Sequence, residues 1–216
     1  MVVASADPAD RVGVYGETRD NFGVWGRSEL AVGVLAETNN ANAPALEARS
    51  LQLNGQAAKF DGHVYVTGTI KVEQDIVFLN AGDIAEEFDV NDSFDADPGT
   101  LMTFRSDGRL VPSTEPYDSR VAGVVAGAGE CRPAMILDRR AVNGRRRAAI
   151  ALMGKVYCKV DADLATIVAG DLLTSSPTQG HAMLARDTSR AYGTVVGKAL
   201  SSLARGKGLI PILVLR

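Results

Sequence analysis

The chain has few of the residues that most often carry catalytic chemistry or crosslinks. Its 216 residues include two cysteines, Cys131 and Cys158, and two histidines, His63 and His181. Two cysteines are too few for a disulfide scaffold, and neither has metal-ligand spacing around it. We interpret both as free thiols, and the sequence leaves open whether they pair. The histidines are far apart and lack a companion carboxylate motif, so we expect no zinc site, no catalytic histidine and no cofactor.

Long apolar runs and an excess of one charge are also missing. No run approaches the roughly 18 residues of a transmembrane helix, and MVVASADPAD at the N-terminus lacks the pattern of a signal peptide. We therefore expect no membrane association and a cytoplasmic or particle-associated location, as in a virion or an injection machine. The 23 Lys and Arg and the 26 Asp and Glu residues are mixed along the chain, which gives no signal for nucleic acid.

Glycine is abundant, with 22 residues, and it is regular in the first third of the chain. Phrases of seven residues recur every ten residues and read VGVYGET, FGVWGRS and VGVLAET. Their equivalent positions are Gly13, Gly23 and Gly33, and then Tyr15, Trp25 and Leu35. Short strands joined by turns at a fixed period are typical of a β-solenoid or fibre, in which these six residues would pack the stem.

The size of one repeat favours assembly from several chains. Its three or so apolar side chains gain roughly 5–8 kcal/mol on burial, whereas ordering ten residues costs about 1–2 kcal/mol per residue. A repeat is therefore unstable alone, and three repeats in one chain are barely sufficient. We predict that three chains wind about a shared axis, where glycine allows close approach of the backbones.

Beyond residue 80 the period of ten disappears and longer strand signals begin. We predict an N-terminal extension over residues 1–11, a β-repeat stem over 12–80 and a C-terminal β head over 81–216. Strand signals fill the head and outnumber helical ones, with Gly, Pro or an Asp/Ser cluster in almost every gap. The predicted fold is all-β, a β-solenoid or trimeric β-helix-like stem followed by a compact barrel or sandwich.

Six phrases in the head carry a resemblance to a known family. They are GDIAEEF, PGTLMTF, YDSRVAGVV, ALMGKVYCKV, AGDLLTSSPTQGHAM and GKALSSLARGKGLIPILV. The head resembles the C-terminal domain of phage and bacterial fibre-like proteins, the peptidase G2-like family of intramolecular-chaperone auto-processing domains. The GVYG-type repeat similarly resembles the stems that precede such domains. The resemblance implies a tail-spike or fibre protein whose last domain can cleave itself.

Carboxylates near the predicted junction are the candidate catalytic groups. Asp83, Glu86 or Glu87 would supply a general acid or base beside a strained Gly82–Asp83 link. The alternative is a solvated acidic face, or strand-end hydrogen bonds to a neighbouring subunit. We favour the alternative because no serine–lysine, cysteine–histidine or serine–histidine–acid arrangement can be identified in the sequence.

Two further clusters are candidate binding sites. Oxygen-rich side chains at Asp89, Asn91 and Asp92 would suit Ca²⁺, but their spacing is not that of an EF-hand, so a plain acidic loop is the preferred interpretation. Five arginines surround a predicted hairpin tip at Asn143-Gly144 and are Arg139, Arg140, Arg145, Arg146 and Arg147. They would bind an anionic partner or the acidic stretch of a neighbouring subunit. No aromatic residues alternate with them, which disfavours nucleic acid.

These observations predict a structural protein. We expect a homotrimer of fibre or spike type, part of a larger fibre or particle, whose head promotes trimerisation and attaches to a partner. The alternatives are an auto-processing chaperone that cleaves near Gly82-Asp83 and an adhesin that binds a glycan or protein receptor.

Overall fold

The computed structural model describes residues 19, 24–140 and 144–214 of the chain. Backbone contacts divide the chain into two compact units, Met1–Lys71 and Val72–Arg216. All named strands and the one helix of the described residues lie in the second unit. They are β1 (Ala81–Asp89), β2 (Leu101–Phe104), β3 (Leu110–Pro112), β4 (Val121–Val125), β5 (Arg132–Leu137), β6 (Arg147–Asp161), β7 (Leu172–Ser175), β8 (Ala182–Leu184), α1 (Thr188–Ala191), β9 (Val195–Ala199) and β10 (Lys207–Val214).

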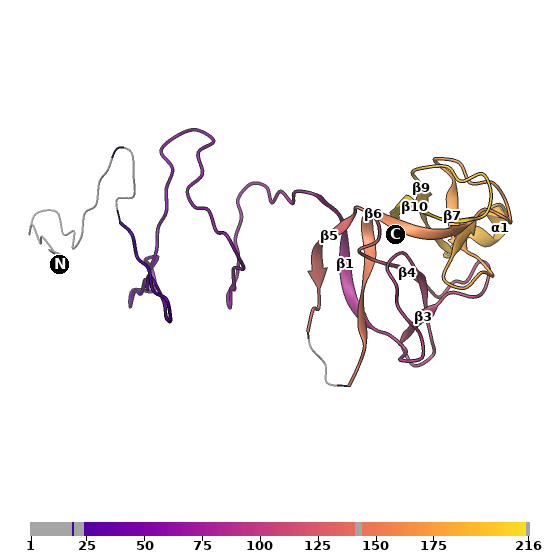
Figure 1. The fold of residues 1–216 in the computed structure, drawn as a ribbon, viewed down its shortest axis with the longest axis horizontal. Helices are drawn as coiled ribbons and strands as arrows, with labels where there is room; N and C mark the ends of the chain where they lie inside the picture. Colours follow the sequence, from indigo (N-terminus) through magenta and orange to yellow (C-terminus); the bar gives the residue numbers. More distant parts are fainter. Residues whose placement is uncertain (1–18, 20–23, 141–143, 215–216) are drawn as a thin grey trace, which may run out of the picture. The chain divides into compact units, whose positions relative to one another are not determined.

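Five strands of the second unit close into a barrel. β6 pairs with β10, β10 with β9, β9 with β7 and β7 with β8, and β8 returns to β6. The returning contact is a single parallel pairing, Val160 with Ala182, and the other four pairings are antiparallel. Figure 1 shows β7, β9, β10 and α1 gathered at the side of the second unit away from β5. Closure removes the exposed edges that an open sheet would have.

The remaining strands extend the sheet from the first half of β6. β1 and β4 both run antiparallel to this half, β2 and β3 continue beyond β4, and β5 lies parallel to β1. The exchange of partners takes place at Gly154, which pairs with Asp83 of β1 and with Val214 of β10. Gly154 has a φ of +102°, and a side chain there would collide with the carbonyl oxygen of Gly82. Only glycine fits this crossing.

Two groups of buried apolar side chains stabilise these layers. The larger group fills the barrel and includes Val156, Leu173, Val196 and Ile212, none of them exposed. The smaller group lies between β2, β3, β4 and the start of β6, where the rings of Phe88 and Phe104 meet edge to face. The second unit is therefore nearly all-β around two groups of apolar side chains, which agrees with the all-β fold predicted for the head.

Several strands differ from the sequence expectation. The sequence predicts two strands here, Ala148–Met153 and Lys155–Val160, whereas β6 is one strand of 15 residues that continues through Gly154. The sequence predicts a solvated acidic face at Asp83, Glu86 and Glu87, but β1 pairs on both sides, Asp83 is buried and the two glutamates are half-buried. Pairing on both sides thus outweighs the low strand propensity of Asp and Glu.

The predicted strands of the repeat stem are not present in the described part of residues 12–80. No strand is assigned from residue 24 to residue 80, and nearly every side chain there is exposed. The stem residues Gly13, Tyr15 and Gly23 lie outside the described residues. A strand needs a hydrogen-bonded neighbour and a surface against which to bury its apolar face, and one chain supplies neither for repeats of this size.

The glycines of the repeats nevertheless lie close together. A Cβ atom at Gly26 would stand 2.5 Å from Cγ2 of Val34 and 2.7 Å from the carbonyl oxygen of Gly33. A Cβ at Gly33 would stand 3.2 Å from the carbonyl oxygen of Gly26. Trp25 and Leu35, the expected packing residues, are 72% and 71% exposed. The structure therefore brings Gly26 and Gly33 of one chain together, while these two large side chains remain mostly exposed. The close approach between chains that the sequence predicts at Gly13, Gly23 and Gly33 stays a prediction.

Candidate functional site: the acidic strand and the arginine loop

Strand β1 and the loop between β5 and β6 bring the acidic and basic clusters together. The sequence predicts a hairpin tip here, but β5 and β6 do not pair with each other, because β1 lies between them. Arg145 Nη1 lies 2.7 Å from Asp89 Oδ2, and Arg146 Nη2 lies 3.0 Å from Asp95 Oδ1. Arg139 pairs with Glu87 at 3.7 Å. The arginines thus contact the acidic stretch of their own chain, whereas the sequence favoured that of a neighbouring subunit.

Arg147 is the one buried member of the arginine cluster. Its side chain is 8% exposed, and its Nη2 donates to Oδ2 of Asp138 at 2.6 Å and to the carbonyl oxygen of Glu87. Its Nε lies 3.4 Å from Asp89 Oδ1. The hydrogen bond from Arg147 lowers the pKa of the Asp138 carboxyl, which Arg140 also contacts at 3.3 Å. Arg147 therefore links β1 to the loop between β5 and β6 through these hydrogen bonds, and its side chain is buried.

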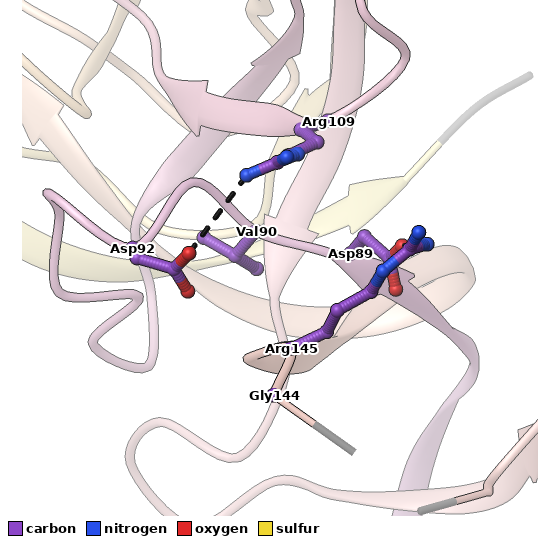
Figure 2. Close-up of a pocket in the computed structure, with 6 residues that line it drawn as sticks. All are labelled: Asp89, Val90, Asp92, Arg109, Gly144 and Arg145. Carbon is purple, nitrogen blue, oxygen red and sulfur yellow. Dashed lines mark hydrogen bonds and ion pairs between the residues drawn. The ribbon is translucent and has the colours of Figure 1, made fainter. Parts of the chain in front are cut away.

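A small polar pocket lies between two ion pairs, Arg145 with Asp89 and Arg109 with Asp92. Its volume is about 120 Å³, and its lining residues are Asp89, Val90, Asp92, Arg109, Gly144 and Arg145. Figure 2 shows Arg145 beside Asp89 on one side and Arg109 reaching toward Asp92 on the other, across Val90. Arg109 Nη1 and Asp92 Oδ2 are 3.8 Å apart. With two guanidinium groups and two carboxylates, the pocket has no net charge of its own, so it gives an isolated anion or cation little advantage.

The predicted Ca²⁺ ligands are engaged elsewhere. Asp89 pairs with two arginines, Asp92 faces Arg109, and Oδ1 of Asn91 accepts the backbone N–H of Ser93 at 3.0 Å. Among the described residues no three His, Cys, Asp or Glu side chains are placed to hold a metal ion. His63 is exposed, and Nδ1 of His181 lies 2.7 Å from the carbonyl oxygen of Gln179.

The candidate catalytic carboxylates do not converge on the Gly82–Asp83 bond. Asp83 pairs with Gly154 across the sheet, and Glu87 lies opposite Ala149, where it faces Arg139. Asp83 and Glu87 are four positions apart along the strand, a distance of roughly 13 Å. Glu86 lies next to Glu87 and away from the bond as well. Only Asp83 remains at the predicted cleavage point.

Asp83 carries a buried carboxyl group without a hydrogen-bond partner among the described residues. It is 2% exposed, and neither carboxylate oxygen has a hydrogen-bond partner within the described part of the chain. Burial raises its pKa to about 6, since a charged carboxylate is poorly solvated there. Asp83 also borders an open apolar pocket of about 350 Å³, lined by Phe78, Ala81, Gly82, Asp83, Ile84, Ala134, Met153 and Gly154.

Sequence reasoning missed three residues that the structure makes prominent. Asp138 anchors Arg147 and Arg140, and its place directly before the arginine run was the available signal. Arg109 comes from the separate hairpin between β2 and β3, so nothing local to the arginine run indicated it. Gly26 has tighter surroundings than Gly33, the other repeat glycine that the structure describes, and it is the second glycine of its own repeat phrase.

Comparison with known proteins gives two solved structures of a phage protein. The chain is similar to the pre-mature bacteriophage phi29 gene product 12, with a TM-score of 0.49 and 14% identity over 69% of this chain and 24% of that one. It is also similar to the C-terminal fragment of bacteriophage phi29 gene product 12, with a TM-score of 0.40 and 15% identity over 62% of this chain and 100% of that one.

The chain corresponds to only part of the longer phage protein, and the other comparisons found no match. The chain spans about a quarter of the length of the pre-mature gene product 12. No protein-family model and no curated protein matches the chain. No helix among the described residues is both long enough and apolar enough to span a membrane.

Proposed function

We propose that the protein is a structural, homotrimeric component of a fibre or spike, with residues 12–80 as its stem and residues 81–216 as a head. In this proposal the head promotes trimerisation and attaches the fibre to a partner, within a larger fibre or particle. The β-repeat stem forms its strands only when three chains supply one another's neighbours.

The exposure of apolar side chains before β1 carries this proposal. Among the described residues, nineteen of the twenty-eight exposed large hydrophobic side chains fall between Val24 and Leu79. Leu30, Leu51 and Leu53 are more than nine-tenths exposed. Isolated apolar residues on a surface are common, but a segment in which they prevail marks an interaction surface. Each of these side chains would contribute about 1.5–3 kcal/mol if fully buried against another chain.

The oligomeric state in dilute buffer tests the proposal. One chain has a mass of 22.8 kDa, so three chains should sediment at about three times that value. A species of one chain at micromolar concentration would overturn the homotrimer, because the exposed apolar segment would then be stable in water by itself. Electron microscopy of the same sample would show whether the trimers are elongated, as a fibre component requires.

A second candidate function is self-cleavage at the Gly82–Asp83 bond. Asp83 favours it, because a buried carboxyl with a pKa of about 6 is suited to proton transfer near neutral pH. Hydrolysis would consume one water and give the fragments 1–82 and 83–216. Intact-mass measurement during prolonged incubation, with and without nucleotide, tests this function. A fragment that begins at Asp83 and is absent from Asp83→Asn would support it, and an unchanged mass would exclude it under those conditions.

A further inference from the structure

An open apolar pocket lies where β1 enters the second unit. Its walls include Met153, which is 62% exposed, and Phe78, which is 47% exposed. Ile84 pairs with Met153 across the sheet, so these two side chains belong to neighbouring strands at one place. Exposed methionine and phenylalanine around a cavity of about 350 Å³ are typical of a surface that binds an apolar group.

Two basic residues without ion pairs lie next to lining residues of this pocket in the strand pairing or in the sequence. Arg132 lies opposite Ala81 in the pairing of β5 with β1, and Lys155 directly follows Gly154 in β6. Both side chains belong to exposed residues, and neither forms an ion pair with a described residue. An acidic group on a docking partner would therefore find two cations at the pocket without displacing an existing carboxylate.

Residues 72–79 have the complementary chemistry. The segment reads VEQDIVFL, and its Glu73 and Asp75 are exposed without an ion pair to any described residue. Ile76, Val77 and Leu79 are 57%, 75% and 82% exposed. No strand is assigned to this segment, although it immediately precedes β1. It thus combines two free acids with an apolar end and unused backbone hydrogen-bonding groups.

Strand β5 offers a matching edge to an extended segment. Within the described residues it pairs with β1 alone, which leaves its other edge without a strand neighbour. Met135 and Leu137 on this strand are 38% and 43% exposed. An extended segment can add to such an edge through backbone hydrogen bonds while its alternate side chains enter adjacent pockets.

We propose that the pocket beside β1 receives residues 72–79 of a second copy of this chain. Glu73 and Asp75 of one copy then face Arg132 and Lys155 of the next, and Ile76 or Leu79 fills the pocket. The chain's own Phe78 is a wall of the pocket, and its own Ile76 and Leu79 remain exposed, so a neighbouring copy is the fitting source. The same contact made by three copies closes a ring. This proposal rests on the homotrimer proposed above. It assigns the contact through which the second unit contributes to trimer assembly.

Crosslinking between two differently tagged chains tests the contact. One chain carries Ile76→Cys and the other Met153→Cys, both in a Cys131→Ser background, while Cys158 is buried and stays in place. The two chains are coexpressed and treated with a short bismaleimide. We expect a covalent pair that contains both tags, and no such pair when Leu164→Cys, an equally apolar exposed site, replaces Met153→Cys.

The outcomes separate this contact from the homotrimer itself. Chains that sediment as trimers without forming the mixed crosslink would overturn the contact and leave the homotrimer standing. Chains that sediment singly would overturn both. As a second measurement, Met153→Asp should weaken self-association about tenfold or more, equivalent to about 1.4 kcal/mol, while Leu164→Asp should not. Equal association of the two variants, each folded by circular dichroism, would also overturn the contact.

Discussion

Replacement of Asp83 by asparagine should change the pH dependence of stability in a calculable way. In the folded chain the pKa of Asp83 is about 6, against an ordinary value of 3.8. The folded state therefore holds a proton that the unfolded chain releases between these values. Ionised Asp83 destabilises the fold above pH 6, and this cost disappears as the pH falls below about 4.

The magnitude follows from the difference between the two pKa values. About two pKa units correspond to a cost of about 3 kcal/mol at pH 8, about 1.5 kcal/mol at pH 5 and about 0.5 kcal/mol at pH 4. The amide introduced by Asp83→Asn cannot ionise, so this variant should gain about 2.5 kcal/mol relative to the native chain between pH 4 and pH 8. Any fixed cost of burying the amide group affects all pH values equally and leaves this change intact.

Urea unfolding of the full chain at a fixed protein concentration, at several values between pH 4 and pH 8, measures this difference. Asp97→Asn is the matched control, because it makes the same substitution at a side chain that is 70% exposed. A constant difference between native and Asp83→Asn across the range would refute the reasoning. It would mean that the Asp83 carboxyl finds a solvating partner in the folded chain.

Three other results are expected. Gly26→Ala should lower the melting temperature of the protein while Arg27→Ala does not, because overpacking against the Gly33 carbonyl costs about 1–3 kcal/mol. Equal effects of the two substitutions, measured by calorimetry, would contradict the close approach of Gly26 and Gly33. Arg147→Lys should lower the urea midpoint more than Arg145→Lys, since lysine cannot reproduce the forked hydrogen bonds of a buried guanidinium. In a carbon-detected NMR titration the Asp138 carboxyl should titrate below pH 3.8, and a normal midpoint would show that Arg147 does not hold it.

The fold of the second unit could be predicted from the sequence because its strand signals are local. Turns such as Pro98-Gly99 and Ser106-Asp107-Gly108 flank β2 and β3, and the apolar runs between turns became strands. β8 was missed because three residues, Ala182–Leu184, carry too little pattern to identify a strand. The continuity of β6 through Gly154 depends on β1 and β10, which lie far away in sequence.

The candidate sites were less predictable than the fold. The acidic and arginine clusters were identified from composition, but their pairing within one chain depends on β1 lying antiparallel to β6. The environment of Asp83 could not be inferred either, since Asp83, Glu86 and Glu87 look alike in sequence, yet Asp83 is buried and the two glutamates are half-buried. Burial and long-range pairing, rather than residue type, decide what each carboxylate does.

The position of β10 in the barrel has a consequence for how the protein folds. β10 lies between β6 and β9, and its pairing with β6 joins residues about fifty positions apart, from Lys207–Val214 to Gly154–Asp161. Until β10 docks, β6 and β9 each retain an unpaired edge, and such edges recruit strands from other molecules. Closure by distant segments is slow, on the order of milliseconds to seconds. Folding intermediates that lack β10 are therefore the species most prone to aggregation, and they persist for as long as the last strand takes to dock.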